Sequence, residues 1–246
     1  LVLSVRLPHP PPAERSGGIY DKTTRGMRIY LATPRLRGLL ALNLSVASAG
    51  AMVIVNTVVM VRGLLGRPES DVAIALACFG GGSMVAALLI PRVLDSLPDR
   101  RLMLPAAVFL GVVLLAFGTL VAEGVWVWPG LLLTWALLGL GYSAILTPTG
   151  RLLRRSAQPA DRPTLFAAQF ALSHACWLVT YPLAGRVGGV AGMPVTLIVL
   201  GSLTLVGAGI TAWLWPSSDP ETVEHAHSEL PADHPHLREH GGEGHR

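Results

Sequence analysis

Six long runs of the chain contain no Asp, Glu, Lys or Arg and consist mainly of apolar residues. A helix needs about 20 predominantly apolar residues to cross the hydrocarbon core of a bilayer, and every run reaches that length. A transmembrane barrel would instead show alternating segments of about ten residues. The pattern therefore predicts an all-α integral membrane protein with six transmembrane helices, over Gly38–Val61, Val72–Pro91, Leu102–Ala122, Gly124–Gly150, Pro163–Gly185 and Val187–Ser218.

The segments that flank these runs differ from them in composition. Residues 1–37 are polar, basic and rich in Pro and Gly, and they lack the apolar core of a signal peptide. We interpret them as a cytoplasmic linker, with a short interfacial helix near residues 20–38, and the alternative is an ordinary N-terminal tail. Because the chain begins with Leu1, it can be a fragment. Residues 38–216 form the predicted transmembrane domain, and residues 217–246 a disordered, His-rich cytoplasmic tail.

Charge sets the expected orientation. Only 14% of the residues are charged, against about 25% in soluble domains. With strict alternation of the six spans, sixteen Lys and Arg residues fall on the side of both termini and three on the other side. Such an excess marks the cytoplasmic side. We therefore expect a multi-pass protein of the cytoplasmic (inner) membrane with both termini in the cytoplasm. Topology accounts for the basic excess, so no nucleic-acid partner is expected.

The fifth run carries an unusual set of polar residues for a membrane helix. At 100° per residue, Gln169, Ser173, Cys176 and Thr180 form one stripe, and Phe170, His174, Trp177 and Tyr181 form the stripe beside it. In lipid such a face must meet protein or a water-filled cavity. We predict a substrate cavity, and bonding to neighbouring helices is the alternative. The candidate lining residues are Gln169, Ser173, His174, Trp177, Thr180, Tyr181, Asn43, Asn56, Tyr142 and Thr147.

His174 is the one side chain inside a predicted span that titrates near neutral pH, so it is the candidate for proton exchange. The alternative is a neutral imidazole bonded to a partner helix. No paired acids lie within the spans, and the chain lacks both H-E-x-x-H and a phosphate-binding G-x-x-x-x-G-K-[ST] loop. No catalytic residue and no enzyme activity are therefore predicted.

The tail contains two His-x-His pairs among acidic residues. Neutral imidazole binds late divalent transition metals, but the irregular spacing implies no closed structural zinc site. Loosely bound divalent metal is thus the one cofactor hypothesis, and a merely solvating acidic tail is the alternative. The tentative metal ligands are His225, His227, His234, His236, His240 and His245.

Six spans with cytoplasmic ends, a basic linker and the short loop PRVLDSLPDRR (residues 91–101) together resemble the C-terminal half of a major facilitator superfamily transporter. The resemblance implies a half built from 3+3 inverted repeats, which rocks against a second half about a midplane site. The loop keeps Asp95 in the family's register, with Arg100 and Arg101 near its end, although Pro91, Ser96 and Pro98 replace signature residues. The resemblance implies that these three residues form a gating loop, in which Asp95 pairs with a base or a helix N-terminus.

The expected function is therefore half of a secondary active transporter, most simply an efflux permease for a small molecule or an ion. Its partners would be the bilayer and the missing N-terminal six-helix half or a second copy. Family members with His-rich tails resemble nickel or cobalt exporters, so export of Ni²⁺, Co²⁺ or Zn²⁺ is one form of this hypothesis. The alternative is a non-transporting membrane subunit or a metal-buffering anchor, which would lack six further spans encoded upstream.

Overall fold

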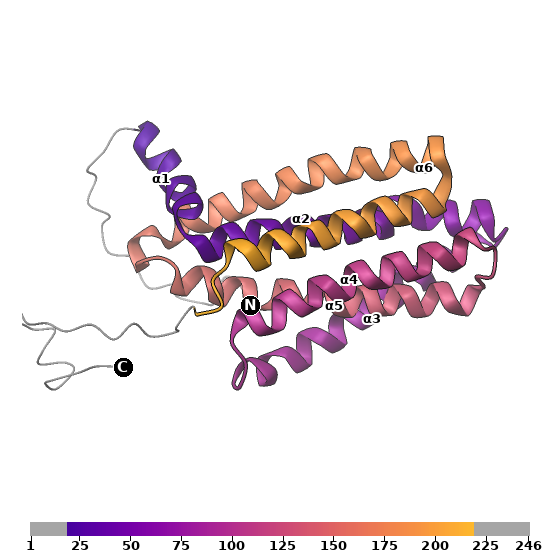
Figure 1. Cartoon of the computed structure of the whole chain (residues 1–246), viewed down its shortest axis with the longest axis horizontal. Coiled ribbons are helices and arrows are strands. Elements are labelled where there is room, and N and C mark those ends of the chain that lie inside the picture. Colours follow the sequence, from indigo (N-terminus) through magenta and orange to yellow (C-terminus); the bar gives the residue numbers. More distant parts are fainter. Residues whose placement is uncertain (1–18, 219–246) are drawn as a thin grey trace, which may run out of the picture. The chain divides into compact units, whose positions relative to one another are not determined.

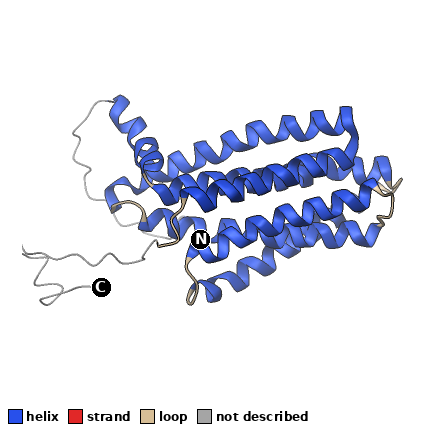
Figure 2. Cartoon of the chain, in the orientation of Figure 1, coloured by secondary structure: helices blue, strands red, loops and turns tan. Residues whose placement is uncertain are grey.

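The computed structural model describes residues 19–218, and this part of the chain consists of helices joined by short connections, with no strand (Figure 1, Figure 2). The all-helical fold class is thereby confirmed. In chain order the helices are α1 Ile19–Ala32, α2 Pro34–Val58, the π-helical turn η2 Val59–Leu64, α3 Glu69–Leu94, α4 Asp99–Ala122, α5 Trp128–Arg155, the 3₁₀ turn η3 Pro159–Asp161 and α6 Arg162–Leu214.

Five helical segments within the described residues are long and apolar enough to cross a membrane. The first three predicted runs lie inside α2–η2, α3 and α4, and the fourth begins in the loop just before α5. The fifth run lies inside α6, and the sixth begins inside α6 and ends just beyond its last residue, Leu214. A multi-pass membrane protein is therefore confirmed in outline, with a difference in how the last two runs are joined.

The predicted break at Arg186 is wrong. Arg186 is helical, and the backbone leaves the helical conformation at Gly192, with φ 82° and ψ 173°. Figure 1 shows α6 folding back into two arms, which we call the first arm (residues 162–191) and the second arm (residues 193–214). A charged residue ends an uncharged run, but a helix reverses where the backbone allows it. Glycine alone adopts this conformation without strain.

Helix α2 is the most buried of the long helices and packs against both arms of α6. Small residues in the stretch Leu44–Met52 permit this close packing. Two hydroxyls bond across to the facing helix: Ser45 Oγ donates to the Thr204 carbonyl at 2.8 Å, and Thr211 Oγ1 donates to the Gly38 carbonyl at 3.0 Å. These bonds hold the second arm beside α2.

The short helix α1 is tied to the start of α6 by an ion pair. Arg25 Nε lies 2.7 Å from Asp161 Oδ1. After α1, Thr33 has an extended conformation and Pro34 opens α2, a favoured first position because Pro lacks the N–H that a helix start leaves unpaired. The predicted short helix before the first span is thus present as α1, and α2 begins inside the range assigned to the linker.

Candidate functional site

A half-open cavity of about 410 Å³ lies among α2, α5 and the first arm of α6. Seven of the ten predicted lining residues contribute to it, although they come from three helices that are distant in sequence. Val46 and Leu146 complete the wall, whose predicted members are Asn43, Tyr142, Gln169, Ser173, His174, Trp177 and Tyr181. That a substrate occupies this cavity stays a prediction.

A buried amide pair forms one side of the cavity. Asn43 and Gln169 exchange two hydrogen bonds of 3.3 Å through their side-chain amides. The Tyr30 hydroxyl, contributed by α1, donates to the same Gln169 oxygen at 2.6 Å. That oxygen therefore accepts two bonds already, and each amide keeps one N–H for another acceptor. The pair is suited to donating hydrogen bonds to a bound molecule.

Tyr30 is a site residue that the sequence analysis missed. Its side chain is fully buried. Burial raises the pKa of the phenol well above its usual value, with the nearby Cys176 thiol adding to the effect. The hydroxyl is therefore neutral at physiological pH and remains a donor to Gln169. The available signal was a tyrosine among the last apolar residues of α1, which indicates a helix docked on protein.

His174 is exposed and bonds within its own helix, not to a partner helix. Its Nδ1 lies 2.8 Å from the Phe170 carbonyl oxygen, and its ring lies 4.0 Å from the Phe170 ring. We assign the proton to Nδ1 because a carbonyl only accepts. Nε2 then has a lone pair that can accept a hydrogen bond.

Aromatic rings form the rest of the wall. Trp177 lies 4.8 Å from Tyr181 and 6.5 Å from Tyr142, measured between ring centroids. Gly50 of α2 makes room for these rings, because a methyl group there would lie 3.0 Å from Trp177 Cζ3 and 3.2 Å from Tyr142 Cε2. Gly50 is a second residue that the sequence analysis did not single out. Such a wall offers flat apolar area and π-faces to a ligand.

The remaining three predicted lining residues do not border the cavity. Thr180 is fully buried, and its hydroxyl lacks a partner among the described residues. Asn56 is buried and bonds to the Met52 sulfur at 3.6 Å. Thr147 bonds to Ser143, one turn earlier in α5. The two polar stripes therefore do not share one surface, because Thr180 is buried inside the helical domain.

The expected pairing of Asp95 is not seen. Asp95 is exposed and forms no ion pair with any described residue. Asp99, four residues later, is fully buried and pairs with two arginines of α5. Its Oδ1 lies 2.7 Å from Arg151 Nη2, and its Oδ2 lies 3.4 Å from Arg155 Nε. Asp99 also opens α4, where the helix dipole favours a negative charge.

The two arginines of the predicted gating loop have different surroundings. Arg100 donates to the Trp215 carbonyl at 2.9 Å, so it caps the end of α6. Arg101 is exposed. Asp99 directly follows Pro98, a pattern typical of a helix start, so the sequence did contain a signal for it. The comparison with the family's loop signature instead selected Asp95.

The six tentative histidine ligands all lie outside the described residues. Within residues 19–218 no group of three or more His, Cys, Asp or Glu side chains could hold a metal ion. The metal hypothesis therefore stays a prediction that depends on the tail alone.

Comparison with protein families gives a match over most of the chain. Residues 39–240 match the family model described as Major Facilitator Superfamily. Comparisons with curated proteins and with solved structures gave no match. The family match agrees with the membrane-spanning helices and confirms the resemblance drawn from the loop and span pattern. The chain belongs to the Major Facilitator Superfamily.

Proposed function

We propose that the chain is one six-helix half of a secondary active transporter that works by alternating access, most simply as an exporter. The observation that carries this proposal is the half-open cavity, with polar and aromatic walls, between helices able to cross a membrane. Family membership supports a membrane transporter as the broader class. Enzyme activity is not typical of this family.

The proposal treats the two arms of α6 as separate spans, which gives six. An uninterrupted helix of 53 residues would be about 80 Å long at 1.5 Å per residue, whereas the hydrocarbon core is about 30 Å thick. The reversal at Gly192 supports two passes. Six spans also permit the 3+3 inverted repeat of the family, and they leave both termini on one side, which the Lys and Arg distribution assigns to the cytoplasm.

The lining chemistry favours a small organic substrate. Among residues 19–218, no Asp, Glu, Lys or Arg lines the cavity, and the walls combine aromatic rings with amide donors. A ligand with an aromatic or apolar body and one or two acceptor groups fits these walls. His174 is the proposed proton carrier for coupling, through Nε2. The half-open side is where the second half, or a second copy, would complete the passage.

Cysteine accessibility in the full-length protein tests the cavity. In a background with Cys78→Ser and Cys176→Ser, we expect a membrane-impermeant thiol reagent to label Ser173→Cys. Leu178→Cys is the matched control, because Leu178 is 76% exposed on the same arm but lies outside the cavity. It should stay unlabelled, since lipid surrounds it. Equal labelling, or protection of Ser173→Cys in every state, would contradict an aqueous cavity.

Two further experiments separate the finer parts of the proposal. Reporter fusions after Arg67 should report the outside, and fusions after Arg155 the inside. Cells that express the full-length gene are plated on graded Ni²⁺, Co²⁺ and Zn²⁺, beside a variant truncated after Pro220. Tolerance that falls on truncation would support metal export assisted by the tail histidines. No tolerance to any of the metals, with retained efflux of organic dyes, would leave a small-molecule exporter.

A further inference from the structure

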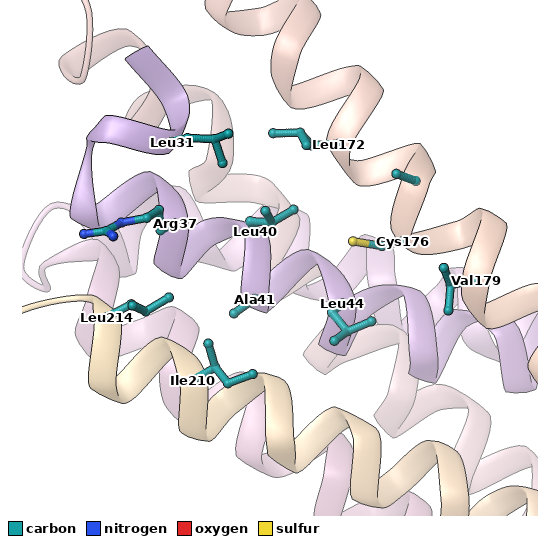
Figure 3. A pocket seen from close by; sticks show the side chains of 11 residues that line it. Leu31, Arg37, Leu40, Ala41, Leu44, Leu172, Cys176, Val179, Ile210 and Leu214 are labelled. Carbon is teal, nitrogen blue, oxygen red and sulfur yellow. The ribbon is translucent and has the colours of Figure 1, made fainter. Parts of the chain in front are cut away.

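A second hollow, which we call the lateral groove, lies between α1, α2 and both arms of α6 (Figure 3). It has a volume of about 510 Å³ and shares no lining residue with the polar cavity. Its walls are almost entirely aliphatic, and include Leu31, Leu40, Leu44, Leu172, Val179 and Ile210. The groove is therefore a separate feature with different chemistry.

The groove opens on the surface of the helical domain. Val179 on one wall is 61% exposed, and Leu31 on the other is 47% exposed. An apolar hollow of this kind does not hold ordered water, which needs polar partners. Left empty, its walls would lose the dispersion contacts of close packing. In a protein that crosses a membrane, a flexible hydrocarbon chain is the filler that the surroundings supply.

One cation stands at the end of the groove. Figure 3 shows Arg37 beyond Leu40, at the opposite end from Val179. Arg37 is exposed and forms no ion pair with any other described residue, whereas Arg25 nearby in sequence pairs with Asp161. A guanidinium binds phosphate with two parallel hydrogen bonds. An aliphatic groove that ends at an unpaired arginine matches a molecule with a hydrocarbon chain and a phosphate head.

We propose that the lateral groove binds one anionic phospholipid, with an acyl chain between α2 and α6 and the phosphate on Arg37. Basic residues at the ends of membrane helices attract anionic headgroups, and hollows between helices hold such lipids. The complementary charge favours this occupant over the apolar face of another protein. The proposal does not depend on transport, so it can fail while the transporter proposal stands.

Native mass spectrometry of the full chain in detergent micelles tests the site. Phosphatidylglycerol and phosphatidylcholine with identical oleoyl chains are titrated separately. We expect one retained phosphatidylglycerol per chain and weaker retention of phosphatidylcholine. Arg37→Gln should weaken phosphatidylglycerol binding about fivefold, the worth of one basic residue near an anionic lipid surface. Arg92→Gln is the control, because Arg92 is exposed on α3 and its one partner among the described residues is the Leu88 carbonyl of its own helix.

Filling the groove gives a test that is independent of charge. Ala175 is exposed and lines the groove, so Ala175→Phe should displace the lipid without disturbing the core. Ala171→Phe, one turn earlier and outside the groove, should bind like the wild type. Glycerol phosphate without acyl chains should not compete. Equal retention of both lipids, or unchanged binding in Arg37→Gln and Ala175→Phe, would overturn the proposal. The proposal would also be overturned if the wild-type protein forms a dimer that binds no lipid, and if Ala175→Phe abolishes that dimer.

Discussion

The crossing of α3 and α5 provides the sharpest test of how the helices pack. Helix α3 contains three consecutive glycines, Gly80, Gly81 and Gly82, which face different directions around the helix. A methyl group on Gly82 would lie 2.8 Å from the carbonyl carbon of Ala136 in α5, and closer still to its oxygen. A methyl group on Gly80 or Gly81 would meet nothing within 4 Å. Of these three glycines, only Gly82 is therefore needed for the backbones of α3 and α5 to touch.

The magnitude follows from two opposing terms. Alanine is favoured over glycine in a helix by about 1 kcal/mol, and this gain applies equally to Gly81→Ala and Gly82→Ala. Gly82→Ala also pushes α3 away from α5, and overpacking of a filled interface costs about 1–3 kcal/mol. We therefore expect Gly81→Ala to stabilise the protein. Gly82→Ala should be less stable than Gly81→Ala by about 1–3 kcal/mol, because the propensity gain cancels in the comparison.

Unfolding in mixed micelles by titration with sodium dodecyl sulfate, followed by tryptophan fluorescence, measures the difference. Trp135 reports on this crossing because it is fully buried in α5, one turn before Gly139. Gly139 provides an independent repeat, since its added methyl would lie 2.8 Å from the Phe79 carbonyl carbon, whereas one on Gly130 meets nothing. If Gly82→Ala and Gly81→Ala unfold at the same detergent fraction, the backbone contact is not what holds α3 to α5.

Three further substitutions test separate features in the same unfolding assay. Asp99→Asn should lower the free energy of unfolding by about 3 kcal/mol, because it removes the buried counter-ion of two arginines. The control Asp95→Asn, at an exposed position, should change it by no more than about 0.5 kcal/mol. Equal effects of the two substitutions would contradict the buried ion pairs. Gly192→Ala should lower the free energy of unfolding by about 1–3 kcal/mol, since the backbone conformation of Gly192 is nearly restricted to glycine. Gly189→Ala should not destabilise the protein. A neutral effect of Gly192→Ala would refute the sharp reversal. Tyr30→Phe should cost about 1 kcal/mol and speed tryptic cleavage within α1, and unchanged cleavage would mean that this hydrogen bond does not dock the helix.

The helices were predictable because the thickness of the hydrocarbon core forces long uncharged runs, and those runs are visible in the sequence. The ends of the helices were less predictable. The lone Arg186 interrupts an uncharged run, yet it remains helical, and the reversal depends on the backbone freedom of Gly192. A hydropathy pattern records which residues tolerate lipid, and it does not record where the backbone can turn.

The polar residues that border the cavity were largely predictable, but the contacts between helices that position them were not. Helical periodicity correctly grouped Gln169 and Ser173 as neighbours, and both border the same hollow. The bond from Tyr30 to Gln169 joins residues 139 positions apart, so no local pattern could reveal it. The position of Asp99 at a helix start was visible in the sequence, but its ion pairs were not, because both arginines belong to another helix.

The reversal at Gly192 also bears on how the chain enters the membrane during synthesis. The first arm carries Gln169, Ser173 and His174, and such polar side chains reduce the tendency of a segment to partition into lipid. The second arm is uncharged and largely aliphatic, and it leaves the ribosome directly afterwards. With so short a turn, the two arms can enter the bilayer as one helical hairpin. The apolar surface of the second arm then offsets the cost of inserting the polar face that borders the cavity.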